Sequence, residues 1–224
     1  MTTAIELEKM RKEQLKLAQN IVLRDEYTKV KVIAGCDCTF EQERAIAAIA
    51  VLEYPSMKLL ETTHAIQEEA MSYLKGYEAY RELPAIVAAI SKLKNKPDII
   101  FCDGNGILHQ RKIGVASHLG IAVDMPTIGV AKKLSFGQVK DGKVWIDNEI
   151  RGFEVTTKDS ANPIYVSPGH KIALGSALKL AIDCTRPPHK LPEPLHIAHK
   201  YGNKVRKNRN REEIKEQDSS AVEA

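Results

Sequence analysis

Residues 32–40 read Val32-Ile33-Ala34-Gly35-Cys36-Asp37-Cys38-Thr39-Phe40, an apolar run with one carboxylate in its middle. The branched and small apolar residues of this run predict a β-strand. Side chains alternate between the two faces of a strand, so Asp37 shares its face with Gly35 and Thr39, while the two cysteines point away. A carboxylate inside a buried strand is costly unless a cation or hydrogen bonds compensate it. Asp37 is therefore the first candidate functional residue.

The pattern around this strand predicts a mixed α/β sheet. Short polar joints separate three β-rich runs, which indicates an antiparallel meander of residues 30–40, 45–54 and 57–66. From residue 98 onward a strand, a helix and a second strand alternate at 99–103, 115–121 and 127–130, as in parallel strands with crossover helices. A helical stretch at 78–94, containing Pro84, connects the two parts. This order resembles the ribonuclease H-like fold, a mixed sheet of three antiparallel and then parallel strands flanked by helices.

The chain reads as one domain followed by a tail. Helical periodicity at 5–22 aligns Met10, Gln14 and Leu17 on one packing stripe. Further β-like runs lie at 143–146, 150–157 and 164–167, followed by a helix at 172–182 and a proline-rich joint at 186–194. We expect residues 1–200 to form a single catalytic domain and residues 201–224 to form a charged, flexible tail.

Composition narrows the class of protein. The 224 residues hold 33 Lys and Arg against 29 Asp and Glu, a net charge of +4. Six of these cations lie without an acid between Lys200 and Arg211, which is consistent with a polyanionic partner or with a solvated tail. No apolar run approaches the roughly 20 residues of a membrane span, and we expect a cytoplasmic monomer. The four cysteines show no C-x-x-C spacing, so disulfides and structural zinc are not expected.

A second strand acid suggests a metal site. Asp103 closes the apolar strand 99–103 and opens a glycine turn, where open α/β sheets commonly bind ligands. The first and fourth strands are neighbours in the expected order, so Asp37 and Asp103 could share Mg²⁺ or Mn²⁺, which prefer oxygen ligands. Spacing alone leaves the third ligand open among Glu69, Glu78 and Glu82. The alternative for each acid is a capped strand end without metal.

Four basic side chains are further candidates. His109, His118 and His170 lie near glycine turns or helix starts, and each could equally be a packed histidine. Lys132 follows a buried strand, where its ammonium could contact a phosphate or simply face solvent. The sequence contains no G-x-S-x-G elbow, P-loop or Rossmann glycine pattern. Metal-assisted phosphodiester hydrolysis is therefore favoured over acyl transfer and redox chemistry.

Several short stretches in series resemble the endonuclease V family of deoxyinosine repair. They are Ile33–Asp37, Tyr80–Glu82, Asp98–Gly106, Arg111–His118, Pro126–Lys133, Gly169–His170 and Leu191–Pro194. The resemblance implies that Asp37, Glu82 and Asp103 bind the metal, and it thereby selects Glu82 among the three glutamates. It also implies that His170 is metal-proximal or catalytic, that His109 lies near the scissile strand, and that Lys132 contacts a phosphate.

The same resemblance implies an activity. Family members cleave DNA at the second phosphodiester bond 3′ to a deaminated adenine and leave 3′-hydroxyl and 5′-phosphate ends, with Mg²⁺ as cofactor and Mn²⁺ as its substitute. The expected partner is double- or single-stranded DNA containing deoxyinosine, or inosine-containing RNA. Tyr73 matches the residue that fills the gap left by the extruded base, and Gly76 and Gly104 match positions that line the base pocket.

The stretch around Tyr73 departs from the family pattern. The usual Pro-Tyr-Ile-Pro-Gly reads Ser72-Tyr73-Leu74-Lys75-Gly76 here, without either proline. Loss of proline raises the entropic cost of ordering a loop. The alternative hypothesis is therefore a nuclease of the same fold that acts mainly on inosine-containing RNA or on branched or single-stranded nucleic acid. A noncatalytic nucleic-acid-binding protein is the third hypothesis, disfavoured because all three acids are present.

Overall fold

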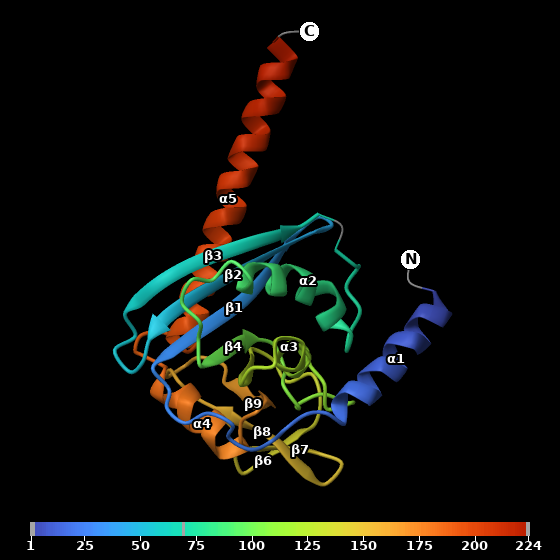
Figure 1. Cartoon of the computed structure of the whole chain (residues 1–224), viewed down its shortest axis with the longest axis vertical. Coiled ribbons are helices and arrows are strands. Elements are labelled where there is room, and N and C mark those ends of the chain that lie inside the picture. The colour runs from blue at the N-terminus through green and yellow to red at the C-terminus, as the bar shows by residue number, and fades with distance from the viewer. Residues whose placement is uncertain (1–2, 69, 223–224) are drawn as a thin grey trace.

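Nine strands form one mixed sheet in the computed structural model, which describes residues 3–68 and 70–222, with the backbone alone from residue 212 onward (Figure 1). The strand order within the described residues is β3-β2-β1-β4-β5-β9-β8-β7-β6. Helices cover both faces of this sheet, so that its central strands are buried on both sides. The α/β fold class is confirmed.

The first five strands have the predicted arrangement. β1 pairs with β2, and β2 with β3, in antiparallel register, while β4 is parallel to β1 and β5 is parallel to β4. The bounds lie close to the predicted ones: β1 Val32–Glu41, β2 Arg44–Glu53, β3 Leu59–Gln67, β4 Ile99–Asp103 and β5 Thr127–Ala131. Continuous apolar runs in these strands are consistent with burial on both faces.

The other half of the sheet is antiparallel. β9 (Ile164–His170) pairs with β5, and β8 (Glu149–Val155), β7 (Lys143–Ile146) and β6 (Gln138–Lys140) follow outward. The sequence analysis did not predict β6, whose three residues are all exposed and therefore lack an alternating burial pattern.

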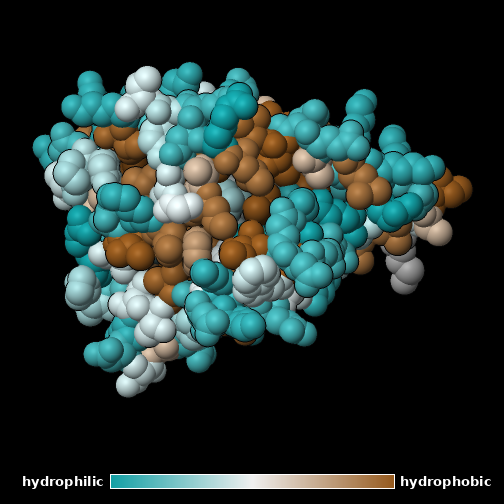
Figure 2. Space-filling model, turned by 90° about the horizontal axis from the view of Figure 1, so that it is seen from below, coloured by the Kyte–Doolittle hydropathy of each residue, from teal (hydrophilic) through white to brown (hydrophobic). Residues whose placement is uncertain are grey.

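The helices form two layers. On one face α2 (Glu78–Ile90) and α3 (Val115–Val123) pack against Ala34 and Cys36 of β1, which confirms the predicted orientation of that cysteine. On the other face α4 (Leu174–Asp183) and the beginning of α5 (Glu193–Val222) pack against Ile33. α1 (Ala4–Ala18) lies at the margin, and it projects on the right of Figure 2 with mostly hydrophilic residues at its surface. Pro84 lies inside α2 without ending it.

Helix α5 was not predicted, because prolines and a polar composition conceal its beginning. It runs through residue 200, where a tail was expected to start, and projects from the sheet (Figure 1). Beyond that boundary Tyr201 Oη lies 2.9 Å from Nδ1 of His64 on β3, and Gly202 lies against β2. The folded part of the chain therefore extends past residue 200. No described helix is both long and apolar enough to cross a membrane.

Gly35 sets how closely α5 approaches the sheet. A Cβ atom at this position would lie 2.2 Å from the carbonyl carbon and oxygen of Pro194 and 2.6 Å from the nitrogen of Leu195. These neighbours are backbone atoms of the first turn of α5, so they cannot rotate away as a side chain would. Only glycine at residue 35 permits this contact between β1 and α5.

We expect Gly35→Ala to lower the free energy of unfolding by about 3 kcal/mol, because overpacking against backbone must displace α5. Chemical denaturation of the two proteins measures the difference. Gly175→Ala is the matched control: nothing lies within 4 Å of the place that a Cβ atom would take at this position of α4, and alanine in a helix should add roughly 0.5–1 kcal/mol. Equal stability of wild type and Gly35→Ala would contradict the proposed role of this contact.

Candidate metal and nucleic-acid site

Two carboxylates meet where the central parallel strands end. The register pairs Cys36 of β1 with Cys102 of β4, so the residues that follow, Asp37 and Asp103, lie side by side. Carboxylate oxygens of the two side chains lie within 4.8 Å of one another. Asp37 is 5% exposed, and its partner is partly buried. The predicted neighbourhood of the two strand acids is therefore present in the structure.

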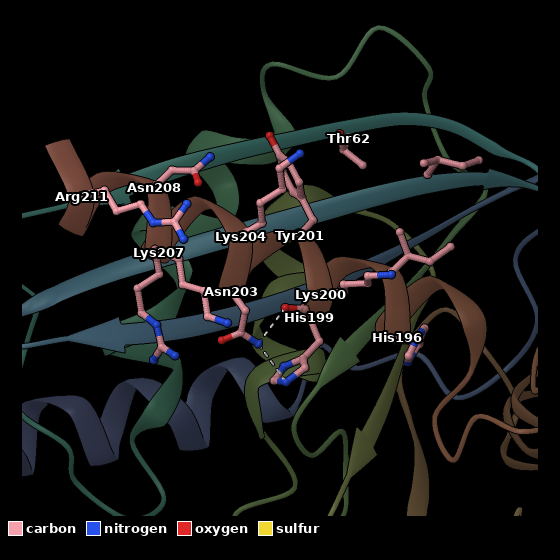
Figure 3. A pocket seen from close by; sticks show the side chains of 13 residues that line it. Thr62, His196, His199, Lys200, Tyr201, Asn203, Lys204, Lys207, Asn208 and Arg211 are labelled. Carbon is pink, nitrogen blue, oxygen red and sulfur yellow. Dashed lines mark hydrogen bonds between the residues drawn. The ribbon is translucent and has the colours of Figure 1, made fainter.

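A histidine that the sequence analysis did not single out completes this cluster. His199 Nδ1 lies 2.8 Å from Oδ2 of Asp37. Nδ2 of Asn203, one turn further along α5, lies 3.1 Å from Nε2 of His199 and 3.0 Å from its carbonyl oxygen (Figure 3). In this arrangement the amide of Asn203 donates to Nε2, and Nδ1–H donates to Asp37. To bind a cation through Nδ1, His199 has to adopt the other tautomer, in which the side-chain oxygen of a turned Asn203 amide can accept from Nε2–H. Candidate ligand atoms of Asp37, Asp103 and His199 all lie within 4.8 Å of one another.

The charges in this cluster are unbalanced. Burial and the neighbouring Asp37 raise the pKa of Asp103 to about 7, so the ionised form of Asp103 is disfavoured without a further cation. Burial opposes ionisation of Asp37 as well, but hydrogen bonds from His199 and Asp103 outweigh it and hold the pKa of Asp37 below its usual value. Lys132 Nζ lies 2.5 Å from Oδ2 of Asp103 and is the nearby cation. The Asp103 carboxylate raises the pKa of Lys132 against the opposing effect of burial.

Glu82 of α2 faces the same cluster across a pocket of about 340 Å³, which also borders Asp103, Gly104 and Lys132. Burial, then the negative charges of Asp103, Glu78 and Asp37, raise the pKa of Glu82 well above its usual value. Of the other two glutamates considered as third ligand, Glu78 already accepts hydrogen bonds from Gly76 N and Tyr73 Oη. Glu69 lies outside the described residues.

These residues fit a divalent cation. Three carboxylates crowd around one lysine, and two of them have raised pKa values, so an added cation would relieve their repulsion. Carboxylate oxygens are the ligands that Mg²⁺ and Mn²⁺ prefer. Thiolates do not contribute, because burial raises the pKa of the free thiol of Cys38 and Cys36 points into the opposite core. Asp37, Asp103 and His199, with Glu82 opposite, can hold the ion.

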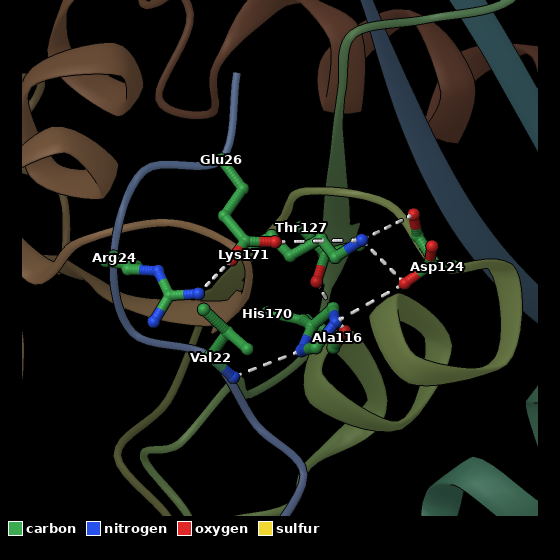
Figure 4. A network of polar contacts seen from close by, with 8 residues as sticks. All are labelled: Val22, Arg24, Glu26, Ala116, Asp124, Thr127, His170 and Lys171. Carbon is green, nitrogen blue, oxygen red and sulfur yellow. Dashed lines mark hydrogen bonds and ion pairs between the residues drawn. The ribbon is translucent and has the colours of Figure 1, made fainter.

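The structure does not bring His170 to this cluster, which differs from the expected position near the metal. His170 pairs with Thr127 at the beginning of β5, whereas Asp103 pairs with Val130 near the other end of that strand. Its Nδ1 accepts from the backbone of Val22 at 3.3 Å, and its ring faces Asp124 within a network that includes Lys171 (Figure 4). The histidine of the Pro-Gly-His motif thus lies at the opposite end of β5 from Asp103, where it contacts Val22.

The other two histidines are packed inside the protein. His109 is 1% exposed and lies against Phe136 and the carbonyl of Gly76. Its contact with a nucleic-acid strand stays a prediction. His118 packs edge to face on Tyr80, with 5.3 Å between ring centroids. Neither ring contacts the acid cluster.

The residues expected to read a base lie beside the pocket. Gly104 lines it next to Asp103 and has φ +148°, a region that favours glycine. Gly76 has φ +82° and contacts His109, another residue of the pocket wall. Tyr73 is 64% exposed, three residues before Gly76, with its hydroxyl 3.4 Å from Glu78. Of the predicted base-reading residues, Gly104 therefore lines the pocket, and Tyr73 and Gly76 contact residues of its wall.

A cationic groove of about 1030 Å³ begins at His199 and follows α5 (Figure 3). Its basic residues are Lys200, Lys204, Arg206, Lys207 and Arg211. Helical periodicity places four of them, at positions 200, 204, 207 and 211, on one stripe. The cations that appeared as a tail in the sequence are thus a surface continuous with the candidate metal site.

Comparison with known proteins agrees with this geometry. The sequence profile of the Endonuclease V family matches residues 15–200. The curated Endonuclease V of Trichormus variabilis is 40% identical over 198 residues, covering 84% of this chain and 89% of that protein. Endonuclease V of Dictyoglomus thermophilum is 36% identical over 200 residues, with 86% and 87% covered.

Solved structures are similar over nearly the whole chain. The catalytic domain of human Endonuclease V has a TM-score of 0.83 and 27% identity, covering 93% of this chain and 99% of that one. Ciona intestinalis Endonuclease V, in complex with a 24mer DNA containing an inosine followed by a ribo-adenosine, has a TM-score of 0.84 and 29% identity, with 92% and 99% covered. With the profile match and the curated relatives, these similarities show that the chain belongs to the Endonuclease V family.

Proposed function

We propose that this protein recognises deoxyinosine in DNA and hydrolyses the second phosphodiester bond 3′ to it, leaving 3′-hydroxyl and 5′-phosphate ends. Membership of the family supports nuclease activity. The inosine-containing DNA bound by the Ciona relative supports the substrate. The single observation that carries the reaction is the meeting of Asp37, Asp103 and His199 beside Lys132.

Each residue of the cluster has a distinct task in this proposal. Asp37, Asp103 and His199, with Glu82, hold Mg²⁺ or Mn²⁺, and Asn203 orients the imidazole of His199. When bound, such a cation would neutralise charge on the phosphoryl oxygens and would lower the pKa of a water molecule. Lys132, which pairs with Asp103, lies where its point charge can stabilise negative charge on a phosphoryl oxygen of the scissile group in the transition state.

Lesion reading uses the opposite side of the pocket. The extruded hypoxanthine lies between Gly76 and Gly104, where the absence of side chains lets the backbone approach the base closely. Tyr73 occupies the gap left in the stack. The cationic groove along α5 receives a flanking strand, since no described carboxylate forms an ion pair with its five basic residues.

The experiment that tests this function is cleavage of a labelled duplex with one deoxyinosine, beside its undamaged control, with Mg²⁺ and with EDTA. We expect one Mg²⁺-dependent product, cut one nucleotide beyond the lesion. Cutting of both duplexes would support a structure-directed nuclease instead. Faster cutting of a single-stranded RNA of matched sequence that contains inosine would instead favour RNA as the substrate.

Asp37→Asn should abolish cleavage and retain lesion binding. The substitution keeps the shape of the side chain but removes an ionised ligand, and loss of several kcal/mol of metal stabilisation corresponds to about 10³-fold or more in turnover. Single-turnover cleavage and binding in EDTA measure the two properties. Asp159→Asn, at an exposed loop acid outside the cluster, is the control. Wild-type turnover in Asp37→Asn would refute the metal assignment.

Tyr73→Ala should weaken binding of the inosine duplex by about 1–3 kcal/mol, roughly 5- to 150-fold, because base stacking on the ring is lost. Tyr73→Phe is the matched variant, since it keeps the ring and loses only the 3.4 Å contact with Glu78. Fluorescence anisotropy in EDTA gives both affinities. If Tyr73→Ala binds the inosine duplex as tightly as Tyr73→Phe does, Tyr73 does not fill the gap in the stack.

A further inference from the structure

The loop that carries Tyr73 (residues 72–77, here called the Tyr73 loop) has no proline, yet its end is fixed. Gly76 has both backbone groups engaged: its N–H donates to Glu78 Oε1 at 2.9 Å, and its carbonyl accepts from Gln14 Nε2 at 3.0 Å and from Arg111 Nη2 at 2.7 Å. The donors come from α1 and from the segment after β4, 62 and 35 residues away. Distant parts of the chain therefore converge on one peptide group.

His109 is a third donor to the same carbonyl. Its Nδ1 accepts from the backbone N–H of Arg111 at 3.2 Å, so in the neutral ring the proton resides on Nε2, which lies 3.2 Å from the oxygen of Gly76. Burial, reinforced by the charge of Arg111, lowers the pKa of His109 to about 4, which keeps the ring neutral near pH 7. The Gly76 carbonyl thus faces three N–H donors.

Gln14 is a buried polar residue whose side-chain amide is paired at both ends. It is 1% exposed, the buried residue of a helix whose outer surface is charged. Burial of an amide is costly unless both ends are paired. Here Nε2 donates to Gly76, and Oε1 accepts from Nε of Arg111 at 2.6 Å. Docking of α1 has separate support, because Tyr80 Oη donates to the carbonyl of Met10 at 3.0 Å.

We infer that Gln14 is a positioning residue for lesion recognition, which fixes the Gly76 end of the Tyr73 loop before nucleic acid binds. Gln14, Arg111 and His109 together hold the peptide group that the proposed function places against the flipped base. The inference rests on that proposed function. A loop ordered in advance loses less conformational entropy on binding. The three hydrogen bonds to the Gly76 carbonyl therefore act on affinity for the lesion and not on the chemical step.

The test compares Gln14→Met and Gln14→Glu with Gln19→Met. Methionine has a similar length and no donor, and glutamate keeps the acceptor for Arg111 while losing the donor to Gly76. Gln19 lies on the exposed end of the same helix, so the identical substitution there controls for changes in α1. Binding is measured by anisotropy in EDTA with inosine and undamaged duplexes, and turnover with Mg²⁺ at saturating substrate.

We expect both Gln14 variants to bind the inosine duplex about tenfold more weakly, with binding of the undamaged duplex and saturated turnover within twofold of wild type. Fluorescence of 2-aminopurine next to the lesion should report less base extrusion at equal occupancy. Gln19→Met should match wild type throughout. A merely structural role of Gln14 would lower both affinities or turnover together with thermal stability, and that result would overturn the inference, as would wild-type discrimination in both variants.

A proline in the loop provides an independent check. Ser72 is exposed, and its backbone N–H forms no hydrogen bond with another residue of the described chain. Ser72→Pro therefore restricts the loop without removing a bond. Added to Gln14→Met, it should recover at least threefold of the lost lesion affinity. No recovery would overturn the role of loop ordering, while a wild-type protein that fails to discriminate inosine at all would instead refute the proposed function.

Discussion

The contact between the first turn of α5 and strand β1 is the constraint on which the site depends. Gly35, Asp37 and Thr39 lie on one face of β1, and α5 runs along that face. Pro194 lies over Gly35, His199 reaches Asp37, and Gly202 lies near Thr39 and against β2. A side chain at residue 35 would collide with backbone atoms of Pro194 and Leu195, so this glycine sets the distance between α5 and the sheet. The position of His199, further along α5, depends on that distance.

Beside that contact, β1, β4 and α2 bring three carboxylates close together in the interior. The pKa values of Asp103 and Glu82 are raised, and Lys132 compensates only part of the negative charge. Burying such groups costs stability unless they are paired. The fold tolerates them where large apolar cores on both faces of the sheet supply the stabilisation, which leaves the cluster free to be arranged for a cation and a phosphate.

The side of the pocket that is proposed to read the base is organised by polar contacts instead. Gly76 is held through its backbone by side chains from α1, α2 and the segment after β4, while Tyr73 projects into solvent. The rigid part of the loop thus lies at the pocket wall and the free part at its tip. The cations of α5 begin next to His199, so the groove that they line is connected to the acid cluster through this histidine.

The sequence by itself determined the central strands, the register of their apolar faces and the two strand acids, because alternation and buried runs are local signals. Resemblance then selected Glu82 and Tyr73. Only the tertiary structure decided which histidine joins the acids: His199 comes from a helix 162 residues beyond Asp37, with no local mark of its role, whereas the conspicuous His170 faces Val22 and Asp124. Likewise Gln14 looked like one more residue of a packing stripe. Its partner is a backbone carbonyl, and pairings of that kind depend on how distant elements pack, which no local pattern records.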